Sequence, residues 1–305
     1  MSDVWTFGET MISLRAASIL SSGGTWTTHV AGAESNVAIG LSRLAHSVTW
    51  CSRVGDDAFG RLILRELAAE GVTVDCEVDA SAPTGFMFLR PTSFGSEVEY
   101  QRTGSAAAAM TARVTESLTR AHPSLVTISG ITPALGPSTT AATLRAAQTA
   151  QDLGAKVVLD VNYRSKLWSR SRAADFLKEI ARHVDVLIGS PDEVDLLAAS
   201  CGRALEHGPS EVVVKLGAAG AELHTAEGML TGPTRAVDAV DPVGAGDAFT
   251  AGYVSAMLDE LGPADRLRRA NAMGAAAVSH VGDFEGLPTR TDLLAWEGSQ
   301  QDVTR

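Results

Sequence analysis

The sequence has few of the features that would set it apart from an ordinary globular enzyme. Only 5% of its 305 residues are aromatic, and no apolar stretch approaches the roughly 20 residues of a membrane-spanning helix. Its cysteines, Cys51, Cys76 and Cys201, form neither a Cys-x-x-Cys pair nor a zinc-binding spacing. The first residues include Asp3 and Glu9, where a secretory signal would need basic and apolar residues. These absences predict a cytoplasmic protein with reduced thiols and no membrane partner.

Basic residues are also scarce. The chain has 25 Lys and Arg against 36 Asp and Glu, so its formal net charge is -11. Such a surface repels nucleic acid and anionic membranes, and no basic cluster offsets it. An anionic small substrate would need a local positive charge in this background. Single Arg and Lys residues near glycine-rich segments are therefore the ones to follow.

The second half of the chain alternates between short apolar runs and helical stretches. Strands are predicted at Leu125–Ser129, Lys156–Val161, Val184–Ile188 and Glu211–Leu216. Helices are predicted at Thr139–Leu153, Arg172–Arg182 and Glu193–Ala199. Continuous apolar strands that alternate with helices indicate an α/β fold, with a mostly parallel central sheet covered by helices on both faces.

The first half contains strands of a different kind. Residues alternate between apolar and polar in Thr84–Arg90 and Glu97–Gln101, which is typical of strands with one wet face. With Met11–Leu14 and Trp26–Val30 they predict a small β-sheet lid, formed from about residues 9–31 and 78–105. Helices at Asn36–Leu44 and Ala58–Glu70 complete a single α/β domain over residues 1–305. Lids of this kind exclude water during group transfer.

A glycine-rich turn before an apolar helix carries the clearest chemical signal. Gly244, Ala245 and Gly246 let the backbone present several N–H groups at a helix N-terminus, where an anion can bind. Asp247 follows in the first turn, where the helix dipole is expected to keep it ionised and able to accept a proton. The alternative for so short a match is a plain loop with an Asp cap. A Rossmann loop is excluded by Phe249, and a Walker A loop by the absence of any Gly-Lys dipeptide.

Four longer blocks resemble one family. Asp241–Tyr253, which reads Asp-Pro-Val-Gly-Ala-Gly-Asp-Ala-Phe-Thr-Ala-Gly-Tyr, is similar to the C-terminal signature of the ribokinase-like, or PfkB, carbohydrate kinases. Gly32–Ala38 and Arg53–Gly60 resemble the family's N-terminal signature, and Lys215–Gly220 resembles its nucleotide loop. The blocks stand in the family's order and span nearly the whole chain, so the plain-loop alternative becomes remote.

The resemblance implies a ribokinase-like kinase that uses ATP and Mg²⁺, with Asp247 as the catalytic base. The anion hole would be formed by Gly244, Ala245 and Gly246. The nucleotide would be bound by Lys215, Gly217, Gly220 and Asn271. Glu193 matches the acidic residue of an Asn-x-x-Glu motif linked to the metal, although Ser190 replaces its Asn.

Two arginines suggest an acidic sugar, because a guanidinium fork matches a carboxylate. Arg102 follows the alternating lid strand, and Arg164 follows a buried strand, where α/β folds bind ligands. These segments, with Ile128–Leu135 and Gly282–Gly286, resemble the 2-keto-3-deoxygluconate kinases of the family. That resemblance implies substrate contacts from Gly32, Asn36, Tyr100, Arg102, Arg164 and Asp283. Met87 departs from it, since close relatives carry Tyr at this lid position.

The leading hypothesis is ATP-dependent phosphorylation of 2-keto-3-deoxygluconate at its terminal hydroxyl, giving the 6-phosphate. A fructokinase or ribokinase activity, or a mononucleoside kinase, are the enzymatic alternatives. A non-catalytic sugar- or nucleotide-binding regulator on the same fold is the alternative of a different class, and Asp247 argues against it because a regulator needs no base. The expected partners are a small sugar acid and ATP, with no nucleic acid. The exposed edge of the lid sheet also suggests a homo-oligomer.

Overall fold

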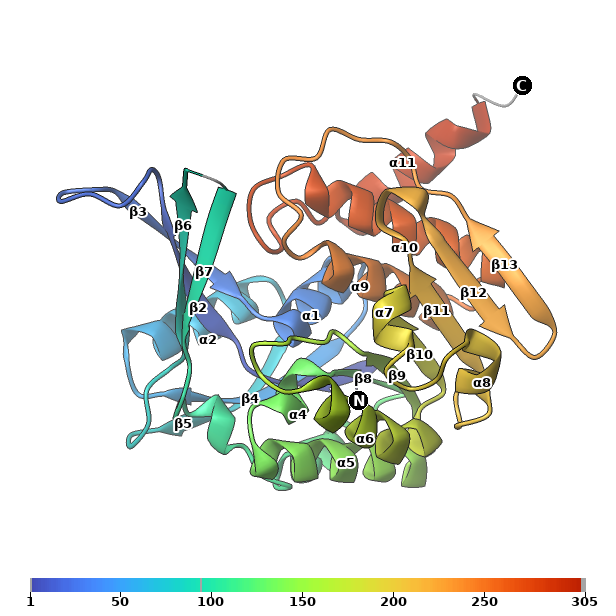
Figure 1. The fold of residues 1–305 in the computed structure, drawn as a ribbon, viewed down its shortest axis with the longest axis horizontal. Helices are drawn as coiled ribbons and strands as arrows, with labels where there is room; N and C mark the ends of the chain where they lie inside the picture. Colours follow the sequence, from blue (N-terminus) through green and yellow to red (C-terminus); the bar gives the residue numbers. More distant parts are fainter. Residues whose placement is uncertain (1, 94, 303–305) are drawn as a thin grey trace.

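A computed structural model describes residues 2–93 and 95–302 of the chain. Within them, nine strands form one large sheet in the order β13-β12-β11-β10-β9-β8-β1-β4-β5 (Figure 1). All neighbours from β11 to β5 pair in parallel, and β12 and β13 add an antiparallel edge. These strands are β1 (Val4–Phe7), β4 (Val48–Gly55), β5 (Thr73–Asp79), β8 (Leu125–Ser129), β9 (Lys156–Asp160), β10 (Val186–Gly189), β11 (Glu211–Lys215), β12 (Ala221–Thr225) and β13 (Gly228–Gly232). The mostly parallel sheet predicted from the sequence is confirmed.

Helices cover both faces of this sheet, because its strands are apolar on both sides. Alternate residues of one strand enter different cores: Val212 packs in one cluster and Val213 in the other. Helices α1, α2, α9 and α10 close the core that contains Val213, and α3, α5 and α6 close the core that contains Val212. The helices are α1 (Ala33–Arg43), α2 (Ala58–Ala69), α3 (Val114–Ala121), α4 (Ile131–Ala134), α5 (Pro137–Asp152), α6 (Arg170–Ile180), α7 (Pro191–Val194), α8 (Cys201–Leu205), α9 (Ala245–Leu258), α10 (Pro263–Val278) and α11 (Arg290–Asp302).

One predicted helix is much shorter than expected. The sequence predicted Glu193–Ala199, but α7 ends at Val194. Beyond it the amides of Leu196 and Leu197 bond to carbonyls three residues back, so the chain continues as tight turns. Both leucines are buried, which shows that packing of this short segment decides its path.

A second, smaller sheet stands apart from the first, at the left of Figure 1. Its order is β3-β2-β6-β7, with the central pair parallel and the outer pairs antiparallel. The strands are β2 (Met11–Ala16), β3 (Trp26–Ala31), β6 (Phe86–Thr92) and β7 (Gly95–Gln101). An aromatic contact between Phe59 of α2 and Phe86 of β6 helps to hold the lid sheet on the large domain, and Phe86 also contacts Phe88 within the lid.

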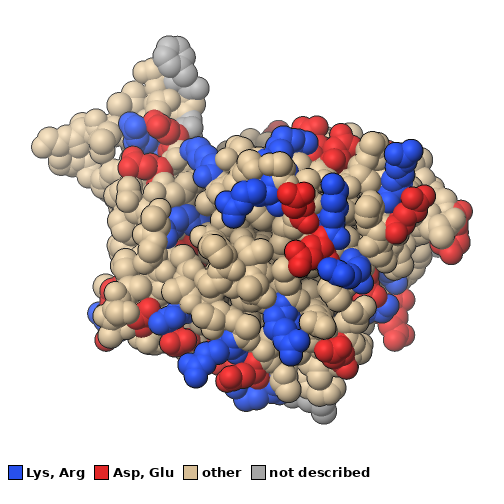
Figure 2. All heavy atoms as spheres, turned by 60° about the horizontal axis from the view of Figure 1, so that its bottom comes forward, with Lys and Arg blue, Asp and Glu red and all other residues tan. Residues whose placement is uncertain are grey.

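Charges of both signs are interspersed on the molecular face shown in Figure 2. No broad area of one sign covers that face. Among the described helices, none combines the length and apolar character required to cross a bilayer.

Candidate active site

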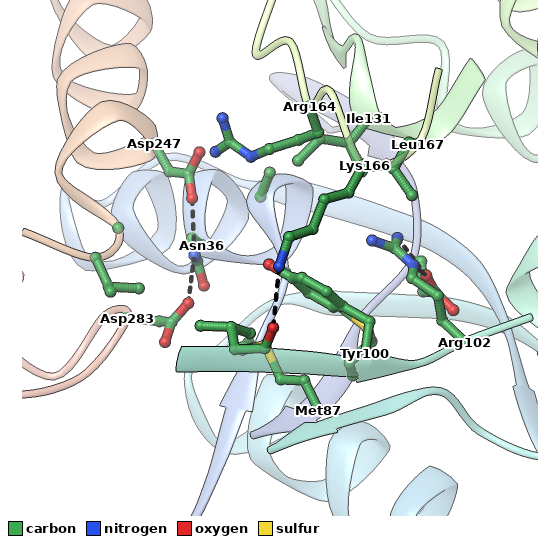
Figure 3. Close-up of a pocket in the computed structure, with 18 of the residues that line it drawn as sticks. Asn36, Met87, Tyr100, Arg102, Ile131, Arg164, Lys166, Leu167, Asp247 and Asp283 are labelled. Atoms are coloured by element: carbon green, nitrogen blue, oxygen red, sulfur yellow. Dashed lines mark hydrogen bonds and ion pairs between the residues drawn. The ribbon is translucent and has the colours of Figure 1, made fainter. Parts of the chain in front are cut away.

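A cavity of about 570 Å³ lies between the lid sheet and the carboxyl ends of the central strands (Figure 3). This volume falls in the range of small-molecule sites. The lid contributes Met87 and Tyr100, the loop after β9 contributes Arg164, and the start of α9 contributes Asp247. Eight residues proposed from the sequence meet in its lining: Gly32, Asn36, Tyr100, Arg102, Arg164, Gly244, Asp247 and Asp283.

The glycine-rich turn forms the N-terminus of α9. Gly244 is the N-cap and has a φ of 76°, in the left-handed region that favours glycine. A Cβ at Gly244 would lie 2.0 Å from the carbonyl oxygen of Asp283, so a larger residue would push the two loops apart. The first amides of a helix have no partner within it. The amide of Ala245 makes a long hydrogen bond, 3.4 Å, to the carbonyl of Pro242, whereas those of Gly246 and Asp247 are available to an anion at the edge of the cavity.

Asp247 lies in the first turn of α9 and is held by two amide side chains. Its Oδ2 accepts a hydrogen bond from Asn36 Nδ2 at 2.8 Å, and its Oδ1 lies 3.4 Å from Asn162 Nδ2. Burial raises the pKa of Asp247 to about 7; Asn36 lowers this pKa and the charge of Asp160 raises it. Burial therefore opposes the effect of the helix dipole, which was expected to keep this group ionised. A carboxyl with this pKa is poised to accept a proton near neutral pH.

A second buried carboxyl, Glu34, lies near Asp247. It is 2% exposed, its Oε1 accepts a hydrogen bond from the Thr132 hydroxyl at 2.5 Å, and its Oε2 has no partner among the described residues. Burial raises the pKa of Glu34 to about 8. A small cavity of about 10 Å³, room for about one water, is lined by both Glu34 and Asp247. A raised pKa of this size favours the neutral form of Glu34 near pH 7.

Lys215 places its ammonium group beside the glycine-rich turn. Its Nζ lies 2.8 Å from both carboxylate oxygens of Asp160, which also accepts a hydrogen bond from Thr250 at 2.7 Å. A Cβ built on Gly246 would lie 3.4 Å from this ammonium group. The predicted nucleotide residue is therefore next to the turn that would hold the transferred phosphoryl group. Asp160 was missed by sequence reasoning, although its place at the end of a buried strand could have indicated it.

The two candidate arginines differ in their partners. Arg164 forms no ion pair with any described residue, and Figure 3 shows its guanidinium on the side of Asp247. Arg102 is already paired: its Nε lies 2.6 Å from Glu9 Oε2, and Nη2 bonds to the same carboxylate. Glu9 is fully buried, and Ser105 also donates to it. Arg164 is therefore the better-placed cation for a substrate carboxylate, while Arg102 has much of its charge compensated.

Lys166 is a cavity residue that sequence reasoning missed. Its Nζ donates to the carbonyl of Val98 in lid strand β7 at 3.2 Å and lies 6.0 Å from the Tyr100 ring centre. Met87 is paired in register with Tyr100 on the neighbouring strand. The loop after β9 thus reaches the lid across the cavity, as Figure 3 shows. The nearness of Lys166 to Arg164 in sequence was the available signal.

The other proposed nucleotide residues lie outside the cavity lining, on the turn after β11 and on α10. Gly217 and Gly220 flank a short 3-10 turn after β11, with φ of 58° and 95°. Asn271 is buried on α10 and donates to the carbonyl of Gly232 at 2.8 Å. The lining of the 570 Å³ cavity, taken over the described residues, includes none of these three. Sugar-contacting and nucleotide-contacting candidates thus fall into separate regions that meet at the start of α9.

Glu193, the proposed metal residue, uses both carboxylate oxygens to bind backbone amides. Oε2 accepts from the amide of Ser190 at 2.7 Å, which forms a capping box at the start of α7. Oε1 accepts from the amide of Tyr163 at 2.8 Å, one residue before Arg164. The described residues contain no cluster of three or more His, Cys, Asp or Glu suited to a metal ion. Glu193 therefore anchors the loop that carries Arg164.

Comparison with known proteins identifies the family. Residues 1–290 match the model of the pfkB family carbohydrate kinases. The chain is 35% identical to a 2-dehydro-3-deoxygluconokinase of Bacillus subtilis, covering 99% of this chain and 97% of the relative. It is 34% identical to a 2-dehydro-3-deoxygalactonokinase of Haloferax volcanii, covering 90% of this chain and 89% of that relative. A crystal structure of a putative ribokinase II from E. coli, in complex with ATP and Mg²⁺, superposes with a TM-score of 0.89 at 26% identity, covering 98% of this chain and all of that one. The predicted kinase family is thereby confirmed: this chain belongs to the pfkB family of carbohydrate kinases.

Proposed function

We propose that this kinase phosphorylates 2-keto-3-deoxygluconate, a sugar acid also called 2-dehydro-3-deoxygluconate, at its terminal hydroxyl. The observation that carries the proposal is the cavity that contains both Asp247 and Arg164. Asp247 suits the reacting hydroxyl as a base, and the guanidinium of Arg164, which forms no ion pair with a described residue, suits a carboxylate. The names of the curated relatives, both kinases of 2-dehydro-3-deoxy sugar acids, support the same substrate class.

In the proposed reaction Asp247 accepts the proton of the terminal hydroxyl as the sugar oxygen attacks the γ-phosphorus of ATP. The new O–P bond forms while the bond from phosphorus to the ADP oxygen breaks. Charge on the transferring group is stabilised by the first amides of α9 and by Lys215. Because the transition state is loose, these residues act mainly through position and charge. The lid closes the cavity against water.

ATP and Mg²⁺ are the proposed co-substrate and metal. The exposed amides at the α9 N-terminus and the ammonium of Lys215 suit the phosphates, and Gly217 has no heavy atom within 4 Å of a Cβ position, so its backbone is open to a ligand. Gly220 and Asn271 would shape the adenine side. The absence of a dense acidic cluster among the described residues is compatible with Mg²⁺, which is often held by one or two carboxylates and substrate phosphates. Mg²⁺ would neutralise charge on the phosphate oxygens, and Glu193 is the residue proposed to act toward it.

A coupled assay of ADP release tests the substrate. The purified enzyme would be compared on 2-keto-3-deoxygluconate, its galactonate-derived epimer, fructose, ribose and nucleosides. We expect the highest kcat/KM on a 2-keto-3-deoxy sugar acid. Met87 in place of Tyr removes one hydrogen-bonding group from the lid, so we also expect weak activity on related sugar acids. A clear preference for fructose, ribose or a nucleoside would reject the sugar-acid assignment and leave the kinase family intact.

We further propose that the protein works in the cytoplasm as a homo-oligomer. The three cysteines are all free thiols in the described structure, which suits a reducing compartment. The lid strands β3 and β7 are sheet edges that could pair with another subunit. Light scattering of the purified protein measures its mass in solution, and a monomeric mass at micromolar concentration would reject the oligomer.

A further inference from the structure

A buried arginine of the lid connects two loops of the active site. Arg15 lies on strand β2 and is 6% exposed. Its Nη1 lies 2.6 Å from Asp241 Oδ2, and its Nη2 lies 2.9 Å from Asp283 Oδ1. All three side chains are largely shielded from water, so these charges interact strongly, and removal of the arginine would leave two uncompensated carboxylates.

The two acidic partners fix the backbone around the anion hole. Asp241 begins the motif that leads into α9, and its carboxylate also accepts hydrogen bonds from the amides of Val243 at 3.1 Å and Gly282 at 3.3 Å. The carbonyl of Asp283 lies directly against Gly244. Arg15 is thus the cation that joins the phosphate-binding turn to the loop opposite it.

The same contacts lead to the base. Asp283 Oδ2 lies 3.5 Å from Asn36 Nδ2, and that nitrogen donates to Asp247 Oδ2 at 2.8 Å. Asp283 also lines the cavity, where it was expected to contact the sugar. A continuous series of side-chain contacts therefore runs from lid strand β2 through Arg15, Asp283 and Asn36 to the base.

We propose that Arg15 is a positioning residue of the kinase: it holds the anion-hole turn and Asp283 in the arrangement that binds the sugar, and so couples the lid to the phosphate site. The proposal rests on the role proposed above for the turn and for Asp283. It assigns Arg15 no contact with the reacting atoms. Its effect is exerted through the two carboxylates.

The charge of Arg15 also affects the titration of Asp283. Burial raises the pKa of Asp283 to about 6, Arg15 lowers it, and the neighbouring Glu285 raises it. Glu285 is itself paired with His29 of β3 at 2.6 Å. With the guanidinium removed, Asp283 faces Asp241, Asp247 and Glu285 without its cation. The pKa of Asp283 then rises. As the pH is lowered, Asp283 therefore becomes protonated at a higher pH than in the wild type, and it loses the ionised form that is proposed to accept a hydrogen bond from the sugar.

The test compares Arg15→Met and Arg15→Lys with wild type, using whichever sugar the wild-type enzyme phosphorylates best. Arg266→Met is the matched control, since Arg266 forms a similar partly buried ion pair with Glu211 and lies outside the described cavity lining. For Arg15→Met we expect the KM of the sugar to rise roughly tenfold or more, because this is the effect of losing about one charge-assisted contact. The KM of ATP should change little. The acid limb of kcat/KM, which reflects the ionisation of Asp283 as well as that of Asp247, should move to higher pH. Arg15→Lys should restore part of both changes.

Two results would overturn the proposal. One is an Arg15→Met enzyme with the wild-type pH profile and sugar KM. The other is equal losses in Arg15→Met and Arg266→Met that follow their melting temperatures alone, which would reduce Arg15 to a stabilising residue. If Arg15→Met does not fold, Arg15→Lys and Asp241→Asn provide the same comparison, with a raised sugar KM expected in each. Failure of the wild-type enzyme on sugar acids rejects the proposed substrate and leaves this comparison valid on another sugar.

Discussion

Asn36 donates a hydrogen bond from Nδ2 to Oδ2 of Asp247 over 2.8 Å, across 211 residues of sequence. The donor is 1% exposed and lies on α1, whereas the acceptor lies on α9. A hydrogen bond to the ionised form of a carboxyl lowers its pKa. Asn36, proposed from the sequence as a substrate contact, would therefore also tune the pKa of Asp247, the proposed base.

The pH dependence of kcat/KM should reveal this pair. Because the base must be ionised and its pKa is about 7, we expect kcat/KM to fall as the pH drops below about 7. Asn36→Ala removes a hydrogen bond that favours the ionised form, so its acid limb should move to higher pH. Steady-state rates from pH 5 to pH 9 measure both curves. Identical midpoints in the two proteins would show that Asn36 does not tune Asp247.

Replacement of the base itself should separate binding from chemistry. Asp247→Asn keeps the size of the side chain and an oxygen that can face Asn36, but its amide cannot take the hydroxyl proton. We expect the fold and ATP binding to be retained and most of the turnover to be lost. Calorimetric titration with ATP, circular dichroism and kcat provide the three readouts. Turnover within a few-fold of wild type would remove Asp247 from the role of base.

Removal of either arginine should raise the KM of the sugar acid, but the two variants should differ in melting temperature. Arg164→Ala removes a cation without an ionic partner, so we expect the KM of the sugar acid to rise by about ten- to a hundred-fold, the equivalent of roughly 1.5–3 kcal/mol. Arg102→Ala should raise the same KM, and it also leaves Glu9 buried without its cation. The melting temperature should therefore fall in Arg102→Ala and hold in Arg164→Ala. Neither change should alter the KM of ATP, and a neutral effect of both on the sugar would contradict the carboxylate-binding role.

Glu193 can be tested for its proposed action toward Mg²⁺. In Glu193→Gln one carboxylate oxygen becomes an NH₂ group, which faces an amide donor and weakens the anchor of the Arg164 loop. We expect the Mg²⁺ concentration for half-maximal rate to rise, and the KM of the sugar acid to rise with it. Rates over a Mg²⁺ series at saturating ATP measure the first effect. A raised sugar KM with unchanged Mg²⁺ dependence would leave Glu193 as a loop anchor only.

Glu34 should make stability depend on pH. Its pKa is raised from 4.5 to about 8 in the folded protein, so the folded state binds more protons between these values. By linkage, the free energy of unfolding decreases as the pH rises through this range. Glu34→Gln has no titrating carboxyl at this position and should lose this slope. From pH 6 to pH 9 the free energy of unfolding should therefore fall more in the wild type than in Glu34→Gln. Urea unfolding at pH 6 and pH 9 measures the free energy of unfolding, and Glu116→Gln, at an exposed position, is the control. The same pH dependence of stability in all three proteins would show that Glu34 ionises freely.

The sequence by itself determined the architecture and the reactive turn, because both depend on local patterns. Apolar runs separated by helical stretches require a sheet covered on two faces, and most of the predicted elements were found within a few residues. Gly244 and Gly246 beside Asp247 define a helix N-terminus with free amides. The segment after Glu193 was the exception, since its helical pattern was overruled by the packing of Leu196 and Leu197.

Only the tertiary structure decided how the charges are paired. Arg102 and Arg164 look alike in sequence, but Glu9, 93 residues away, forms an ion pair with the first, whereas the second forms no ion pair with a described residue and acts on Asp247 only through its charge. Arg15 carried no local signal, because its partners lie more than 200 residues further along the chain. The pKa of Asp247 likewise depends on desolvation by elements brought together in folding, which the helix dipole alone could not indicate. Coulombic and desolvation energies depend on distances in space, and a sequence specifies those only through its fold.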